Sequence, residues 1–517
     1  MTNPSSVCVV GGGHNGLVCA IMLAKAGWHV TVLEARASLG GAIAPRTFAP
    51  GFQAPGLAHH YGQLHPKILK ELGLSPKGGP PIDTIALDRS GDHATLGGTE
   101  ASGNGLTSED KKAYSAFKAD YTAFAQALEP LLLNKPPRLK DMGRDDQWTL
   151  AKIGWSLRFG LGVPSMREFL RVGGANICDV LNEIFDNELI KGAIAADAVM
   201  GHHLGPRTPT SVLPFLLRTF SESHSGPTVS AHHGNHLASD LERIALSYGI
   251  ELRTETKVER IRVVNERAAG VVLEGGESID SDVVVSNVDA KSTFLTLTGA
   301  CNLDAMFTHR ISKTRTNGNV AKLHLGLSAA PQFEGLSAAQ LQHRIVIAPD
   351  MRFVERAFNH AKYGEYSPHP IVDITIPSLR DPSLAPDGKH VMSISASFAP
   401  YKLKEGWDHG RAGFRKVLID TIEPYVPGME ALIEAEEFLS PVDIENEYGI
   451  AGGHWHHGEM TIDQAFMMRP IHGTAQYDTP VKDLFLCGAS AHPGGGVTGI
   501  PGWNAAKRIL SLHQERG

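Results

Sequence analysis

The chain has 517 residues, with 42% hydrophobic residues, 20% charged residues and a formal net charge of −7. This composition excludes a disordered chain, and the lack of a basic excess argues against a dedicated nucleic-acid-binding protein. Glycine is frequent, at 55 residues against an average of about 7%, and has no collagen period. The positions of these glycines are therefore the first clue to function.

The five cysteines are widely spaced and odd in number, which argues against a disulfide framework and favours a reducing, intracellular setting. The uncharged stretch 1–24 lacks the basic start of a secretory signal and contains three consecutive glycines. A second uncharged stretch, 484–506, contains six glycines and two prolines, unlike a membrane-spanning helix. We therefore expect a cytoplasmic protein without a transmembrane segment.

The N-terminal region follows the order of a βαβ nucleotide-binding unit. Residues 7–10 are a short apolar run typical of a buried parallel strand, and a glycine-rich turn follows at 11–16. A helix is predicted over 17–26, and a second strand over 29–33 ends at Glu34. Strand, glycines, helix, strand and acid in this order indicate a dinucleotide site, without choosing between NAD and FAD.

Each part of this turn has a physical role. Gly11 permits a tight turn, Gly13 lets the backbone approach a pyrophosphate, and Gly16 allows the helix to pack closely on the strand. The start of the helix presents N–H groups and a positive dipole end to phosphates. Glu34 lies 18 residues after Gly16, where an acid can bind ribose hydroxyls. The predicted cofactor-binding residues here are Gly11, Gly13, His14, Asn15, Gly16 and Glu34.

The chain continues with Arg36, the pair Gly40-Gly41 and then Gly51-Phe52. This continuation resembles the FAD-dependent amine-oxidase and phytoene-desaturase superfamily, in which a second glycine pair lets the chain pass close to the flavin's phosphates and ribityl. The resemblance implies that Arg36, Gly40 and Gly41 lie near a bound FAD. An NAD dehydrogenase needs no second close approach of this kind.

Residues 108–132 are predicted to form one amphipathic helix, because apolar side chains recur at alternating spacings of 3 and 4. This stripe fits a helix that faces the core, and the lining of an apolar substrate channel is the alternative. Its members are Tyr114, Phe117, Tyr121, Phe124, Leu128 and Leu131.

The segment 135–171 is basic, with eight Lys or Arg residues against four acids, in a chain that is acidic as a whole. Four aromatic side chains are interleaved with these charges: Trp148, Trp155, Phe159 and Phe169. A basic, aromatic segment can touch a membrane surface, and the solvated helices of a cap domain explain it as well.

From 249 to 287 short strands alternate, with Gly275-Gly276 as a hairpin signal. In the family this segment completes the FAD domain, and the resemblance implies that the backbone of Val258 contacts the adenine end. The preceding run departs from the family's glycine-rich helix entry at His232, His233 and His236. Further strands are predicted for the sheet of a substrate domain, over 321–327, 371–376 and 391–398.

The C-terminal region repeats the strand-to-glycine pattern, with a strand over 484–487 that runs into Gly488 and a helix over 502–512. Only 18 residues follow Gly499, too few for a second nucleotide fold. The glycine loop and helix start instead supply N–H groups to the electron-rich N1–O2 edge of a flavin. The stretch 487–506 resembles the carotenoid-desaturase-like group, which implies that Gly488, Gly496 and Val497 contact the cofactor.

Histidine is frequent, with 25 residues and clusters at 59–60, 202–203, 232–233 and 454–457. No HExxH motif or cysteine–histidine spacing accompanies them, so no metal site is predicted. His59 and His60 follow the segment that passes the flavin in this family, and His456 precedes the C-terminal loop. A histidine there could act as a general base, although structural duty explains each one as well. His59, His60 and His456 are the candidate catalytic residues.

Together these elements predict an α/β protein of the amine-oxidase and phytoene-desaturase type. We expect a discontinuous Rossmann-like FAD-binding domain, a helical cap and an α+β substrate-binding domain with a mixed sheet. The expected boundaries are 1–75, 225–300 and 440–517 for the FAD-binding domain, 76–224 for the cap and 301–439 for the substrate domain.

The resemblance implies hydride transfer from a fairly apolar small molecule to N5 of FAD, as a dehydrogenation, desaturation or oxidation. Oxygen, a quinone or another acceptor would reoxidise the flavin. Two alternatives stay open: a redox-neutral isomerase or saturase that uses reduced FAD, and a flavin-containing binding protein without enzymatic activity. No nucleic-acid partner is expected, and the sequence does not predict an oligomeric state.

Overall fold

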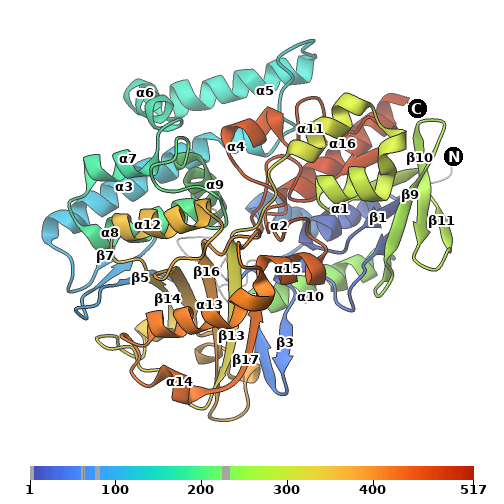
Figure 1. Ribbon diagram of the computed structural model, residues 1–517. Helices are drawn as coiled ribbons and strands as arrows, with labels where there is room; N and C mark the ends of the chain where they lie inside the picture. Colours follow the sequence, from blue (N-terminus) through green and yellow to red (C-terminus); the bar gives the residue numbers. More distant parts are fainter. Residues whose placement is uncertain (1–4, 60–61, 63, 76–81, 224–232, 517) are drawn as a thin grey trace.

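The computed structural model describes residues 5–59, 62, 64–75, 82–223 and 233–516 (Figure 1). Two sheets divide the molecule, a parallel one built from both ends of the chain and a larger mixed one. Within the described residues, no helix combines the length and the apolar character needed to cross a membrane.

The smaller sheet has five parallel strands in the order β18-β12-β1-β2-β8. Its strands are short apolar runs because helices cover both faces, as in other parallel sheets. Helix α1 packs against both α16 and α10. The bounds are β1 Ser6–Val10, α1 His14–Lys25, β2 His29–Leu33, α10 His233–Ser247, β8 Glu251–Arg253, β12 Val283–Ser286, β18 Leu484–Leu486 and α16 Ile500–Arg516.

An antiparallel sheet of three strands precedes β12: β9 (Val258–Val264), β10 (Arg267–Leu273) and β11 (Ser278–Asp280). Gly275 and Gly276 make the turn between β10 and β11, both with positive φ. The predicted hairpin is therefore confirmed, and glycine is needed there because other residues rarely adopt this conformation.

The larger sheet is mixed, in the order β17-β13-β16-β15-β14-β5-β6-β7. The three predicted substrate-domain strands are present as β13, β15 and β16. The segment expected as a helical cap differs, since it also contributes β5, β6 and β7, and β5 pairs in parallel with β14. The bounds are β5 Thr84–Leu87, β6 His93–Leu96, β7 Ala101–Ser102, β13 Val320–Leu327, β14 Arg344–Ile347, β15 Ile371–Thr375, β16 His390–Ser397 and β17 Ile433–Leu439.

The predicted helix over 108–132 is two helices, α3 (Ser108–Ala127) and α4 (Glu129–Leu132). The break follows from Pro130, which has no N–H to continue the backbone ladder. All six stripe residues are buried, so the core-facing interpretation is confirmed. The other helices of this region are α5 Arg144–Trp155, α6 Gly162–Val172, α7 Ile177–Ile184, α8 Glu188–Val199 and α9 Val212–Ser223.

The remaining elements connect the two sheets or cover the larger one. They are β3 Arg46–Ala49, β4 Phe52–Ala54, α2 Pro66–Leu72, α11 Ala305–Lys313, α12 Met351–Lys362, α13 Trp407–Ile422, α14 Met429–Leu432 and α15 Pro441–Tyr448. The buried residues form three large apolar clusters, one around each sheet and one under the α3, α8 and α9 helices.

Candidate cofactor and active site

The turn after β1 is shaped for close backbone approach. Gly11 has φ +96° and donates its N–H to the Leu33 carbonyl at 2.8 Å. A Cβ on Gly13 would lie 2.7 Å from Nδ2 of Asn287, and one on Gly16 would lie 2.4 Å from the Gly11 carbonyl oxygen. Helix α1 starts at His14, three residues earlier than predicted. Gly13 is its N-cap, and none of the described side chains caps its first turn. Those N–H groups are available to an anion.

Glu34 ends β2 with its carboxylate fixed and buried. Its Oε2 accepts the Gly12 N–H at 2.8 Å, and its Oε1 accepts the Arg36 N–H at 2.9 Å. These charge-assisted bonds hold an anionic acceptor beside the glycine turn. This is the arrangement that ribose hydroxyls require.

The second glycine pair lies directly against the first turn. Gly40 donates its N–H to the Gly12 carbonyl at 2.9 Å, and a Cβ on Gly41 would lie 3.1 Å from Cα of Gly13. The guanidinium of Arg36 reaches the Gly41 carbonyl and stacks over the Tyr448 ring at 4.2 Å. The two separate glycine segments thus form one narrow cradle.

A cavity of about 310 Å³ runs along this cradle. The predicted residues that line it are Gly11, Gly13, His14, Asn15, Glu34, Arg36, Gly41 and Val258. Gly16, Gly40 and Gly488 lie behind its wall, where they let backbones pack. A Cβ on Gly488 would lie 2.4 Å from the Asn287 carbonyl oxygen. Sequence reasoning missed Asn287 and Tyr448, because neither lies in a recognisable motif.

A second cavity of about 180 Å³ adjoins the first, and four residues line both: His14, Ala42, Trp455 and Ala489. The predicted Gly496 and Val497 line the second cavity, together with the candidate catalytic residues His59 and His456. His60 lies outside the described residues. The structure therefore brings His59, His456 and the C-terminal loop together at the far end of the dinucleotide cavity.

His59 belongs to a buried polar network. Its Nδ1 lies 2.8 Å from Nζ of Lys322, and its Nε2 lies 3.4 Å from Oδ1 of Asp373. Burial and the neighbouring Lys322 lower the pKa of His59 to about 4, and burial lowers the pKa of Lys322 to about 7. Burial alone would raise the pKa of Asp373, but Arg344 and His59 hold it well below its usual value.

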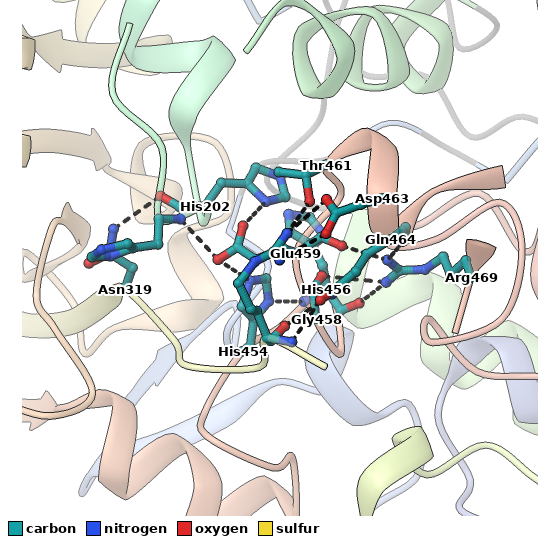
Figure 2. A network of polar contacts seen from close by, with 12 residues as sticks. His202, Asn319, His454, His456, Gly458, Glu459, Thr461, Asp463, Gln464 and Arg469 are labelled. Carbon is teal, nitrogen blue, oxygen red and sulfur yellow. Dashed lines mark hydrogen bonds and ion pairs between the residues drawn. The ribbon is translucent and has the colours of Figure 1, made fainter. Parts of the chain in front are cut away.

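A second buried network surrounds Glu459 (Figure 2). Its Oε1 accepts the His203 N–H at 3.0 Å, its Oε2 lies 3.2 Å from Nδ1 of His202, and Nε2 of His454 lies 3.4 Å from Oε1. Burial would raise the pKa of Glu459, but hydrogen bonds from His202 and His454 hold it well below its usual range. The carboxylate is therefore ionised, and Nδ1 of His202 carries the proton.

The other ring nitrogen of His202, Nε2, forms no hydrogen bond with any residue that the structure describes. The ring lines the second cavity and stacks on His456 at 4.9 Å. Burial lowers the pKa of His202 from its ordinary value, so the ring is neutral near pH 7. The Glu459–His202 pair thus presents an unprotonated nitrogen to the cavity, as in other carboxylate–histidine pairs that accept protons.

His202, His454 and Glu459 also place three potential metal ligands within 4.8 Å of one another. Two observations favour a hydrogen-bonded cluster. Nδ1 of His454 accepts the His456 N–H, which leaves the proton on Nε2, the atom that would bind the ion. A divalent ion beside Glu459 and the buried guanidinium of Arg469 would also leave a charge of about +2 without compensation.

Arg469 ties this cluster to the C-terminal loop. Its guanidinium is buried and donates to carbonyl oxygens of Glu459, Gln464, His456 and Ala489 at 2.6–3.1 Å (Figure 2). Burial lowers its pKa to about 10, so it stays charged at neutral pH. Lys322, Glu459 and Arg469 were not singled out from the sequence. A lysine inside the fully apolar run of β13 is the signal that could have revealed the first.

Comparison with known proteins places the chain among oxidoreductases. The description "NAD(P)-binding Rossmann-like domain" matches residues 9–70. The chain is 32% identical to pyridine nucleotide-disulfide oxidoreductase domain-containing protein 2 of Rattus norvegicus, over 97% of this chain and 92% of that protein. It is 26% identical to a limonene dehydrogenase chain of Castellaniella defragrans, over 97% and 94% of the two chains. With zeta-carotene-forming phytoene desaturase of Myxococcus xanthus it shares 26% identity over 64% and 60%.

Among solved structures, putrescine oxidase bound to putrescine matches with a TM-score of 0.61, at 14% identity over 99% of each chain. Identity this low speaks for the fold alone. The predicted Rossmann-like α/β fold of the amine-oxidase type is confirmed, and so is the resemblance to carotenoid desaturases.

Proposed function

The chain belongs to the family of pyridine nucleotide-disulfide oxidoreductase domain-containing protein 2, and from this membership we propose a flavin-dependent oxidoreductase that binds FAD. The observation that supports this most is the junction of the two cavities at His14, Ala42, Trp455 and Ala489. A dinucleotide bound at the glycine cradle would extend toward this junction, where a substrate could meet its far end.

The described residues fit FAD. Two glycine segments leave room that a single Cβ would fill, and the first turn of α1 is uncapped. Nε2 of His14 is buried without a hydrogen bond to the described residues, beside the C-terminal loop. Glu34 would bind the ribose, Gly13 and α1 the pyrophosphate, and Gly496 with Val497 the flavin edge.

The walls of the second cavity favour a substrate with an apolar body and one polar group. Apolar side chains line one part, among them Leu57, Met200, Leu217, Met460 and Val497. His59, His202 and His456 line the rest. Names among the relatives, limonene dehydrogenase and phytoene desaturase, point the same way. We propose a hydroxyl or amine as the polar group.

Bound FAD would supply the acceptor for a hydride from the substrate carbon. The protein's own task is to position that carbon, exclude water and accept the proton of the polar group. Nε2 of His202 is the acceptor that we propose, because Glu459 fixes its tautomer and can stabilise the imidazolium. His59 is less suited, since Lys322 and Asp373 occupy both of its nitrogens.

The purified protein is expected to be yellow, and an anaerobic titration with candidate terpenoid alcohols or amines should bleach its flavin absorbance. Bleaching by substrate alone identifies an oxidation. Turnover only after prior chemical reduction would instead identify the isomerase or saturase. A coloured protein that no substrate bleaches would favour a binding protein, and a colourless protein that FAD cannot reconstitute would contradict all three.

Replacing His202 with Gln is expected to slow the reductive half-reaction about 10²- to 10⁴-fold, the usual contribution of a general base. Flavin content should stay unchanged. The wild-type rate should fall as the pH drops below His202's lowered pKa, since only the neutral ring accepts a proton. Glu459→Gln should also slow the reaction. His203→Gln is the matched control, because that ring is exposed and stacks on Phe358. An unchanged pH profile in His202→Gln would contradict the assignment.

A further inference from the structure

One surface is unlike the rest of the molecule. We call the region from Arg138 to Leu170, which includes α5, the π-helical turn Ser156–Gly160 and α6, the aromatic arm. In Figure 1 its helices lie along one edge, on the far side of the cap from the larger sheet. Its exposed apolar side chains are Leu139, Trp148, Trp155, Phe159 and Leu170, each 61–67% accessible to solvent.

The aromatic members share one face. Trp148, Trp155 and Phe159 are seven and four residues apart, a spacing that places side chains on the same side of a helix. The rings of Trp155 and Phe159 are in contact, with centroids 4.4 Å apart. Large apolar side chains gathered on one surface mark an interaction site, because leaving them in water is unfavourable.

The charges between these side chains are positive. Five exposed cations of the aromatic arm form no ion pair within the described part of the chain: Lys140, Arg144, Lys152, Arg158 and Arg167. The acids are largely neutralised, since Asp145 pairs with Lys135 at 3.5 Å and Glu168 pairs with Arg171 at 2.6 Å. Asp146 is buried and accepts hydrogen bonds from the Gly143 N–H and the Gln476 amide.

From this juxtaposition we propose that the aromatic arm docks the protein on a bilayer that contains anionic lipids. The tryptophan and phenylalanine rings enter the interface, where amphipathic aromatic side chains are stable, and the cations meet the headgroups. This docking is independent of the flavin and goes beyond the proposed function.

A second copy of the chain is the other occupant to consider, and the charges disfavour it. A two-fold dimer would bring the same patch of each copy together. The five unpaired cations would then face one another across a surface that excludes water, which is unfavourable. An anionic lipid surface compensates the same charges.

The test uses the full-length protein and vesicles of phosphatidylcholine, with or without about 30% phosphatidylglycerol, at a physiological ionic strength of about 0.15 M. We expect co-sedimentation with the anionic vesicles and at least tenfold weaker binding to the neutral ones. The triple variant Trp148→Ser, Trp155→Ser, Phe159→Ser should bind anionic vesicles at least tenfold more weakly. Its side chains are exposed, so the melting temperature and flavin content should not change.

Tyr363→Ser is the matched control, since this exposed aromatic residue lies outside the aromatic arm and should leave binding unchanged. A charge variant, Lys140→Gln with Lys152→Gln and Arg158→Gln, should lose the preference for anionic vesicles. Absence of wild-type binding, or equal binding by the triple variant, would overturn the proposal. A dimer in sedimentation that the triple variant dissolves, without vesicle binding, would identify a second copy as the occupant.

Discussion

Glu34→Lys is expected to purify with less than about a tenth of the wild-type flavin, because a charge-assisted hydrogen bond is worth roughly 1.5–3 kcal/mol. The carboxylate is anchored by the N–H groups of Gly12 and Arg36, so it faces the cavity in one orientation. A lysine can accept no hydrogen bond from a ribose hydroxyl, and its charge would be buried beside Arg36. The measurement is the ratio of the visible flavin absorbance to the ultraviolet protein absorbance of the purified variant.

Glu259→Lys is the control for the change of charge, since Glu259 is exposed on β9 and outside the cavity. Glu34→Gln keeps the size of the side chain and should retain an intermediate amount of flavin. An unchanged flavin ratio in a correctly folded Glu34→Lys protein would refute the ribose assignment, and the position of FAD would have to be redrawn.

Arg344→Met is expected to lower the free energy of unfolding by about 3–5 kcal/mol, the usual cost of removing one partner from a buried ion pair. Arg344 is fully buried in β14. Its Nη2 lies 2.8 Å from Oδ2 of Asp373 and 2.7 Å from Oδ1 of Asp197. Methionine fills a similar volume but leaves both carboxylates without their cation. Chemical denaturation at pH 7 measures the loss.

The loss should shrink as the pH falls. Arg344 helps to hold the pKa of Asp373 far below its ordinary value, so the pair contributes stability above the unfolded-state pKa. That contribution disappears as the pH drops through the folded-state pKa. In Arg344→Met the carboxyl can take a proton more easily in acid, so the two proteins converge there. Arg356→Met, at an exposed position on α12, should change stability by no more than about 0.5 kcal/mol.

The sequence was sufficient for what depends on neighbours along the chain. The strands before Gly11 and Gly488 and the acid at Glu34 follow from local pattern, and the family resemblance added the second glycine pair. The start of α1 was predicted three residues late because His14 and Asn15 are poor helix formers. They are tolerated there, since the first N–H groups of a helix have no intrahelical partner.

The two buried networks were beyond the same reasoning. Glu459 meets His202 across 257 residues of sequence, and Arg344 meets Asp197 and Asp373 from three separate elements. No spacing records such a contact. Lys322 and Arg344 are also charged residues in strands that are buried throughout, and sequence reasoning assigns charges to the surface. Only the folded sheet shows which carboxylates compensate them.

The order of strands in the parallel sheet also governs when this protein can acquire its cofactor during synthesis. β1 pairs with β12 and not with β18, which joins the sheet on the far side of β12. The glycine turn emerges from the ribosome first, but Val497 and α16, which packs on α1, emerge last. At about 5–20 residues per second, translation of the whole chain takes roughly 25–100 s. During that interval the nascent N-terminal unit exposes an incomplete nucleotide site, so stable cofactor capture is a post-translational event.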